Sequence, residues 1–144
     1  MTVTFCGHKE INDPSTVRSA LNSVLLNLLA QGADDFLLGG YGAFDMIAAR
    51  AVYELKRQHP DIRSTLVIPY LNRDYDSSLY DGTTYPPLEE IPKRFAITKR
   101  NEWMVEQADV VVAYVKHDWG GAAAMLRYAE RKNMRIINIS SQKS

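Results

Sequence analysis

The sequence predicts an α/β domain of the three-layer class, with a five-stranded and mostly parallel sheet. Apolar, β-branched segments alternate with segments of helical period, in the order β-α-β-α-β-loop-α-β-α-β. Strands separated by helices need crossover connections, which make the strands parallel and place helices on both faces of the sheet. The 144 residues, 46% of them hydrophobic, predict a single domain over residues 1–144.

The first half of the chain predicts three strands and two helices. The β-branched and aromatic segment TVTFC ends at Gly7 and predicts the first strand. Apolar residues at helical spacing after Pro14 predict a helix that ends at Gly32. The short segment FLL predicts the second strand, AFDMIAARAVYELKRQ the second helix and STLVIPY the third strand.

The second half opens with a loop excursion at about residues 70–92, which is polar and rich in tyrosine and proline. A helix is expected over residues 98–107, and DVVVAYV is typical of a strand buried on both faces. GGAAAMLRYAERKN predicts the last helix and RIINIS the last strand. We expect the Rossmann-like strand order 3-2-1-4-5, in which ligands bind beyond the first and fourth strands, where the order reverses.

The composition limits the classes of partner. Lys plus Arg equals Asp plus Glu at 17 each, so no overall positive charge attracts nucleic acid, which is not an expected partner. No stretch approaches the roughly 18 apolar residues of a membrane span, so no membrane partner is expected. The single cysteine, Cys6, excludes an internal disulfide and fits a cytoplasmic location. His8, His117 and Asp118 lack a metal-ligand spacing, and neither a metal nor a cofactor is expected.

Two glycine-rich turns form the strongest candidate ligand site. Gly39, Gly40 and Gly42 lie between the second strand and its helix, and Gly120 and Gly121 occupy the same place after the fourth strand. Glycines in such turns permit a close backbone approach, and the amides at the start of the helix can bind a phosphate or carboxylate. The pattern is neither a dinucleotide fingerprint nor a P-loop. The alternative is that these glycines only let each helix pack tightly on the sheet.

Four segments resemble the SLOG superfamily of nucleotide-associated domains, and within it the short YpsA-related group: FCGHKE, GGYGAFDMIAARAV, AITKRNEWMVEQADVVVAYV and GGAAAMLRYAERKNMRIINI. The resemblance implies a nucleotide or nucleotide-derived small ligand at the carboxyl ends of the strands, with its phosphate on the glycine-turn amides. The residues that it implies for the pocket are Gly7 and Lys9, then Gly39, Gly40, Gly42 and Asp45, then Arg100 and Asn101, and last Gly120 and Gly121. Lys9 stands where arginine is commoner.

The resemblance to more distant SLOG relatives implies two alternative functions. LOG-type enzymes imply cleavage of the N-glycosidic bond of nucleotides, and DNA-processing DprA proteins imply the binding of single-stranded DNA. The LOG-type late turn reads P-G-G-x-G-T-x-x-E, and its glutamate serves the hydrolysis. Here the turn reads WGGAAAMLRYAE, where the acid is replaced by an apolar residue or Arg127. Glycosidic hydrolysis, or phosphoribosyl or deoxyribosyl transfer, would then need another acid, and the candidates are Asp45, Glu102, Asp118 and Asp74.

Several side chains have both a structural and a ligand-binding interpretation. His8 is suited to a phosphate or to a backbone carbonyl, Asp45 to a ribose hydroxyl or to the capping of a helix, and Arg100 to a phosphate or to a solvated helix face. Aromatic side chains are candidates for stacking on a base, for the core, or for a homo-oligomer interface through the tyrosine-rich loop. They are Tyr70, Tyr75, Tyr80, Tyr85, Trp103 and Trp119.

Overall fold

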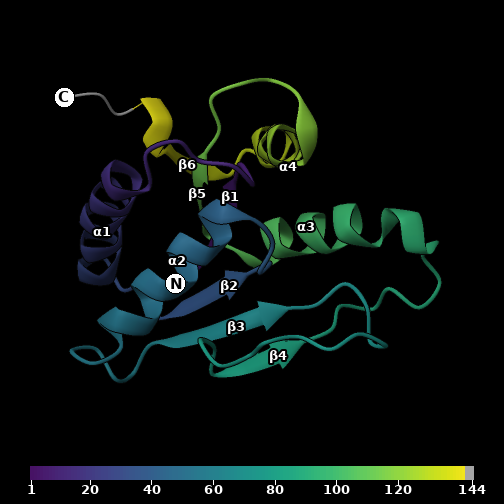
Figure 1. The fold of residues 1–144 in the computed structure, drawn as a ribbon, viewed down its shortest axis with the longest axis horizontal. Coiled ribbons are helices and arrows are strands. Elements are labelled where there is room, and N and C mark those ends of the chain that lie inside the picture. Colours follow the sequence, from purple (N-terminus) through teal and green to yellow (C-terminus); the bar gives the residue numbers. More distant parts are fainter. Residues whose placement is uncertain (142–144) are drawn as a thin grey trace.

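The computed structural model describes residues 1–141, which form one parallel sheet of six strands (Figure 1). The strands are β1 (Thr2–Gly7), β2 (Asp35–Leu38), β3 (Arg63–Val67), β4 (Gly82–Thr84), β5 (Val110–Tyr114) and β6 (Arg135–Asn138). Their order in the sheet is β4-β3-β2-β1-β5-β6, and each neighbouring pair is parallel. The expected order is confirmed, with β5 and β6 as its last two strands. The expected number of five strands is wrong, because the excursion contributes β4.

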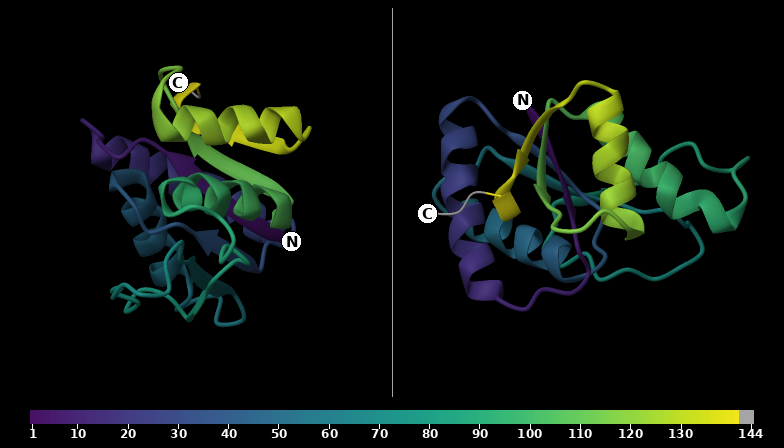
Figure 2. Two further views of the ribbon diagram at one scale, coloured as in Figure 1. Left: turned by 90° about the vertical axis from the view of Figure 1, so that its right-hand side faces the viewer. Right: turned by 90° about the horizontal axis from the view of Figure 1, so that it is seen from above.

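Helices cover both faces of the sheet (Figures 1 and 2). One face carries α1 (Pro14–Ala30) and α2 (Ala43–Leu55), and the other carries α3 (Ala96–Gln107) and α4 (Gly120–Arg131). Side chains along β1 alternate between these layers, since Phe5 belongs to the core beneath α1 and α2 whereas Cys6 belongs to the core beneath α3 and α4. Two short 3-10 helices, η1 (Lys93–Phe95) and η2 (Ile139–Ser141), complete the fold. Within the described part of the chain, none of the helices has the length and apolar character that crossing a bilayer requires.

Strand β4 forms because side-chain and backbone contacts hold a short segment against β3. The Asp81 carboxylate accepts a hydrogen bond from the Ser64 amide at 2.8 Å and forms an ion pair with Lys56. The Asp81 amide donates to the Ser64 carbonyl at 2.9 Å. Three residues of sequence GTT carry too weak a strand signal to be predicted, so the pairing with β3 decides the structure here.

Gly7 ends β1 directly beneath α2. A Cβ atom built on Gly7 would lie within 3 Å of the Phe44 ring, which is fully buried. The absence of a side chain at Gly7 therefore allows α2 to approach the end of β1. This close approach brings the segment after β1 to the beginning of α2.

We predict that Gly7→Ala lowers the free energy of unfolding by about 2 kcal/mol, because the added methyl group overpacks the contact with Phe44. Chemical denaturation measures this change. The matched control is Gly121→Ala, whose Cβ would meet no atom within 4 Å and which lies in a helix. The control should raise stability by up to about 1 kcal/mol. Equal effects of the two substitutions would contradict this account of Gly7.

Candidate functional site

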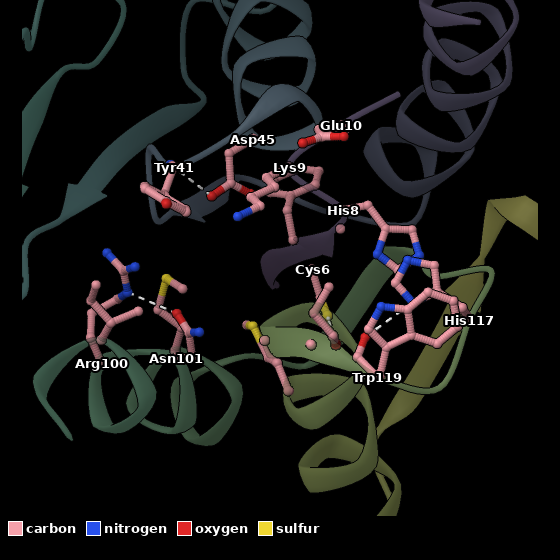
Figure 3. A pocket seen from close by; sticks show the side chains of 18 residues that line it. Cys6, His8, Lys9, Glu10, Tyr41, Asp45, Arg100, Asn101, His117 and Trp119 are labelled. Atoms are coloured by element: carbon pink, nitrogen blue, oxygen red, sulfur yellow. Dashed lines mark hydrogen bonds between the residues drawn. The ribbon is translucent and has the colours of Figure 1, made fainter. Parts of the chain in front are cut away.

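A cavity of about 600 Å³ opens at the carboxyl ends of β1 and β5, where the strand order reverses (Figure 3). Its walls come from the segment after β1, the start of α2, helix α3 and the turn that begins α4. Most of the predicted ligand residues line it: Gly7, His8, Lys9, Asp45, Arg100, Asn101, Trp119, Gly120 and Gly121. Gly39, Gly40 and Gly42 are not among its lining residues.

The first glycine turn fixes the backbone instead of presenting free amides to the cavity. Gly40 and Gly42 have positive φ angles of 69° and 90°, and a Cβ on Gly42 would lie 2.6 Å from the Lys9 Cα. This close approach lets the Ala43 amide donate to the Lys9 carbonyl at 3.0 Å, and the Phe44 amide to the His8 carbonyl at 3.3 Å. These amides of α2 therefore already have protein acceptors, contrary to the expectation that they bind a phosphate.

Asp45 caps the same turn and is buried beside the cavity. Its Oδ2 accepts a hydrogen bond at 3.0 Å from the Tyr41 amide, which lies in the turn before the helix, and α2 has no side-chain hydrogen bond at its N-cap. Burial raises the pKa of this carboxyl to about 6, although the Tyr41 amide and the Arg100 charge lower it. Asp45 is thus a carboxyl group that can change its protonation state near neutral pH while facing the cavity.

Arg100 is buried, with only 3% of its surface exposed, and it joins the ends of two strands. Its Nη1 donates to the carbonyls of Gly39 at 3.0 Å and Val67 at 2.8 Å, and its Nε donates to the Asn101 side chain at 2.8 Å. Burial lowers the pKa of the guanidinium, whereas Asp45 raises it. The solvated-face interpretation of Arg100 is wrong, and its observed partners are backbone carbonyls.

The second glycine turn has a different geometry. Trp119 is the N-cap residue of α4 and gives no side-chain hydrogen bond to the helix, whose first amides have no intrahelical acceptors. A Cβ on Gly120 or Gly121 would meet no atom within 4 Å, so this turn faces open space in the cavity. Gly120 has a positive φ of 92°. The amino end of α4 is therefore accessible to an anion.

Three aromatic side chains form a stacked column along one wall of the cavity. The ring centroids of His8 and His117 lie 3.8 Å apart, and those of His117 and Trp119 lie 3.6 Å apart, with nearly parallel planes. Trp119 ends this column with 66% of its surface exposed. Figure 3 shows Arg100 and Asn101 on the opposite side of the cavity from His117 and Trp119.

The floor of the cavity is apolar and rich in sulfur, with Cys6, Met104 and Met125. The Cys6 thiol donates to the Ala122 carbonyl at 3.0 Å, and burial raises the pKa of this thiol well above its usual range. Such a thiol stays protonated and is not a nucleophile at neutral pH. The floor is thus suited to contact with an apolar or aromatic part of a ligand.

The other predicted acids lie away from the cavity. Glu102 forms an ion pair with Lys99 at 3.2 Å, and Asp118 belongs to a neighbouring surface hollow of about 460 Å³. No residue of the excursion 70–92 lines the cavity, so its tyrosines do not wall the candidate site. Glu10 does line it, and the sequence motifs do not single this residue out. Its place next to Lys9, just after the first strand, is the sequence feature that indicates it.

Comparison with known proteins decides the family. The model of the YpsA family, described as the YspA SLOG family, matches residues 8–82, which is just over half of the chain. The chain belongs to the YpsA SLOG family. The matched part contains the segment after β1 and the first glycine turn, so the SLOG resemblance drawn from these motifs is confirmed.

Curated members of the group are distant in sequence but extend over most of this SLOG chain. The UPF0398 protein YpsA of Bacillus subtilis is 23% identical over 136 residues, which cover 81% of this chain and 72% of that protein. A UPF0398 protein of Halalkalibacterium halodurans is 24% identical over 132 residues, which cover 83% and 70% of the two chains.

Solved structures share the fold of this SLOG chain. The X-ray structure of TM1055 matches with a TM-score of 0.64 at 13% identity, over 98% of this chain and 78% of that one. DNA processing protein A from Streptococcus pneumoniae matches with a TM-score of 0.67 at 16% identity, over 94% and 48%. The same protein from Helicobacter pylori, for which a single-stranded DNA binding mode is described, matches at 0.66 and 15%, over 94% and 63%. This chain therefore spans about half to two thirds of those two proteins.

We predict that Arg100→Ala lowers the free energy of unfolding by about 3 kcal/mol, because it leaves two buried carbonyls without their charged donor. Urea denaturation gives the value. Lys99→Ala is the matched control on the exposed face of α3, where loss of a surface ion pair should cost less than about 0.5 kcal/mol. If both variants were equally stable, Arg100 would not hold β2 and β3 together.

Asp45→Asn tests the buried carboxyl through the pH dependence of stability. The folded protein keeps the Asp45 proton up to a pKa of about 6, and the unfolded chain loses it near 3.8, so ionisation of Asp45 lowers stability as the pH rises between these values. Asparagine keeps an acceptor for the Tyr41 amide but does not titrate. The unfolding free energy of the variant relative to the wild type should therefore rise by about 3 kcal/mol between about pH 3 and pH 8.

The control for this measurement is Asp118→Asn, which changes an exposed carboxylate outside the cavity. Its stability relative to the wild type should change by less than about 0.5 kcal/mol over the same range. A flat difference for Asp45→Asn, or one that falls with rising pH, would contradict the raised pKa.

Proposed function

We propose that this protein binds a nucleotide or nucleotide-derived small ligand in the cavity at the carboxyl ends of β1 and β5, with the phosphate at the amino end of α4. One observation carries the proposal: a single cavity at the switch point of the sheet joins an open helix terminus to a stacked aromatic wall. A ligand with a negative charge and an aromatic ring would match both features, because its charge suits the helix terminus and its ring suits the aromatic wall.

The amino end of α4 supports the position of the phosphate. The helix dipole and the first-turn amides, which lack intrahelical acceptors and have no side-chain cap among residues 1–141, stabilise negative charge there, and Gly120 and Gly121 leave room for a phosphate to approach. Lys9 lies on the facing wall as an exposed cation. The equivalent amides of α2 are occupied by backbone carbonyls, so we place the phosphate at the second glycine turn rather than at both turns.

The aromatic wall and the apolar floor support the position of the base. Trp119 presents an exposed ring at the end of the stacked column, and the sulfur-rich floor offers an apolar surface beneath it. A volume of about 600 Å³ lies within the range of small-molecule sites. Asn101 and Asp45 then supply polar groups for sugar hydroxyls or the edge of the base.

Cleavage of an N-glycosidic bond is the second candidate function, and Asp45 is the observation that favours it. A carboxyl with a pKa of about 6 inside a cavity is suited to general acid or base catalysis, and Glu10 lines the same space. Asp45 is the only sequence-predicted acid among the residues that line the cavity. Released free base after incubation with nucleoside monophosphates or NAD, and its loss in Asp45→Asn, would establish this activity.

The test of ligand binding is a thermal-shift panel with nucleoside monophosphates, diphosphates and NAD. A ligand present at one hundred times its Kd stabilises the folded state by about 2.7 kcal/mol, which raises the melting temperature by several degrees. We predict that Gly121→Asp keeps the intrinsic stability, because an acid in the first turn favours the helix, and loses the shift, because the carboxylate repels the phosphate.

Ser15→Asp is the matched control, since Ser15 is the second residue of α1 as Gly121 is of α4, but it does not line the cavity. This variant should keep the full ligand-induced shift. A shift that survives in Gly121→Asp would place the anion elsewhere. A panel without any shift, together with salt-dependent retardation of single-stranded DNA, would replace the proposal with a DNA-binding function.

A further inference from the structure

We propose that His8 is a positioning residue, which in its neutral form holds residues 116–119 against the cavity and on protonation releases them. This segment leads into α4 and carries Trp119, so its position decides whether the aromatic wall and the helix terminus face the same space. The role of His8 is to control the geometry of the site. Only its second test, which measures AMP affinity, rests on the proposed function.

His8 is tied to two elements through its backbone. Its amide donates to the Tyr114 carbonyl at the end of β5 at 3.2 Å, and its carbonyl accepts from the Phe44 amide of α2 at 3.3 Å. These bonds hold the residue in a defined place. Its ring then reaches a third element, because Nε2 accepts a hydrogen bond from the Lys116 amide at 2.8 Å.

The stacked column carries this contact on to Trp119. His117 lies between the other two rings, with interplanar angles of 13° to His8 and 18° to Trp119. The Trp119 carbonyl, which can only accept, lies 3.1 Å from Nδ1 of His117, so that nitrogen carries the proton. Each ring in the column is therefore oriented by its neighbour, and Figure 3 shows the three lying together at the cavity wall.

Protonation of His8 breaks the first contact of this chain. Nε2 can accept from the Lys116 amide only while it is unprotonated, and an N–H at that position would face another donor. Lys116 and His117, from the segment after β5, disfavour the cation. Lys9 and Glu10 follow His8 on its own segment and line the same cavity. Tyr114 packs edge-on from β5, and Asp13 before α1 interacts with Lys116.

Burial lowers the pKa of His8, and the nearby His117 and Lys116 lower it further. The neutral ring is thus the form present at neutral pH, and the column is assembled there. Acidification below the ordinary range of histidine places a positive charge on the His8 ring, which the Lys116 charge and the His117 ring stacked 3.8 Å away both oppose. The loss of the Lys116 bond and this unfavourable electrostatic interaction both favour release of the segment.

The first test needs no ligand. Ring nitrogen signals of the histidines, the Lys116 amide and the Trp119 indole are followed by NMR from about pH 8 to about pH 5 in the wild type, in His8→Phe and in His59→Gln. His59, after α2, is the matched control because it belongs to none of these contacts. Phenylalanine keeps a flat ring at position 8 but removes the acceptor.

In the wild type and in His59→Gln, the Lys116 and Trp119 signals should shift with the midpoint of the His8 ring, below its ordinary pKa. In His8→Phe that midpoint should be absent. If the Lys116 and Trp119 signals change with pH in the same way in His8→Phe as in the wild type, the proposal is overturned. A protonated Nε2 of His8 in the neutral wild-type protein would also overturn it, and this observation needs no variant.

The second test compares AMP affinities by calorimetry. The wild type should bind AMP about fivefold more tightly than His8→Phe at about pH 8, and equally at about pH 5, because the acceptor is then lost in both. Both proteins bind the same AMP at each pH, so the ionisation of AMP does not affect the ratio of their affinities. If AMP binds but the ratio of the two affinities stays constant with pH, the inference about His8 is overturned and the proposed function is not. Absence of AMP binding with the expected NMR course would refute AMP binding by the proposed site and leave the role of His8 supported.

Discussion

The capping of α2 by the carbonyls of His8 and Lys9 is the contact on which the rest of the site depends. It requires that Gly42 has no side chain, because a Cβ there would collide with the Lys9 backbone. It also requires the close approach of Phe44 to Gly7 at the end of β1. Together these contacts hold the segment after β1 across the end of the sheet, where its side chains face α4 rather than solvent alone.

Two turns of similar sequence have opposite properties for this reason. The first amides of α2 donate hydrogen bonds to carbonyls of the segment after β1. The first turn therefore connects parts of the protein and does not offer these amides to a ligand. No side chain caps α4 among the described residues, and its two glycines face open space. Two charged residues of the cavity also have partners within the protein. Arg100 donates to backbone carbonyls, and Asp45 accepts from an amide of the first turn. The open character of the cavity therefore comes from α4, the aromatic column and the segment after β1.

Membership in the YpsA SLOG family rests on residues 8–82, which contain the segment after β1 and the first glycine turn at the edge of the sheet where the cavity lies. Helix α4 and two of the three rings of the aromatic column, His117 and Trp119, lie beyond that match. Curated relatives cover about four fifths of this chain at identities near one quarter, so the chemistry of this part has to be judged from the contacts of this chain. Those contacts favour a ligand that combines negative charge with an aromatic ring.

Local sequence determined the elements of this protein, because hydrophobic period, β-branched runs and glycine stops act over a few neighbouring residues. The layer order and the reversal between β1 and β5 followed from those elements and from the rules of parallel sheets, and these together with the SLOG motifs indicated nine of the residues that line the cavity. Strand β4, the partners of Arg100 and the stacking of His8 on His117 were decided only by tertiary structure. Each joins segments far apart in the chain, and whether a donor meets a carbonyl or a ligand depends on distances that no local pattern encodes.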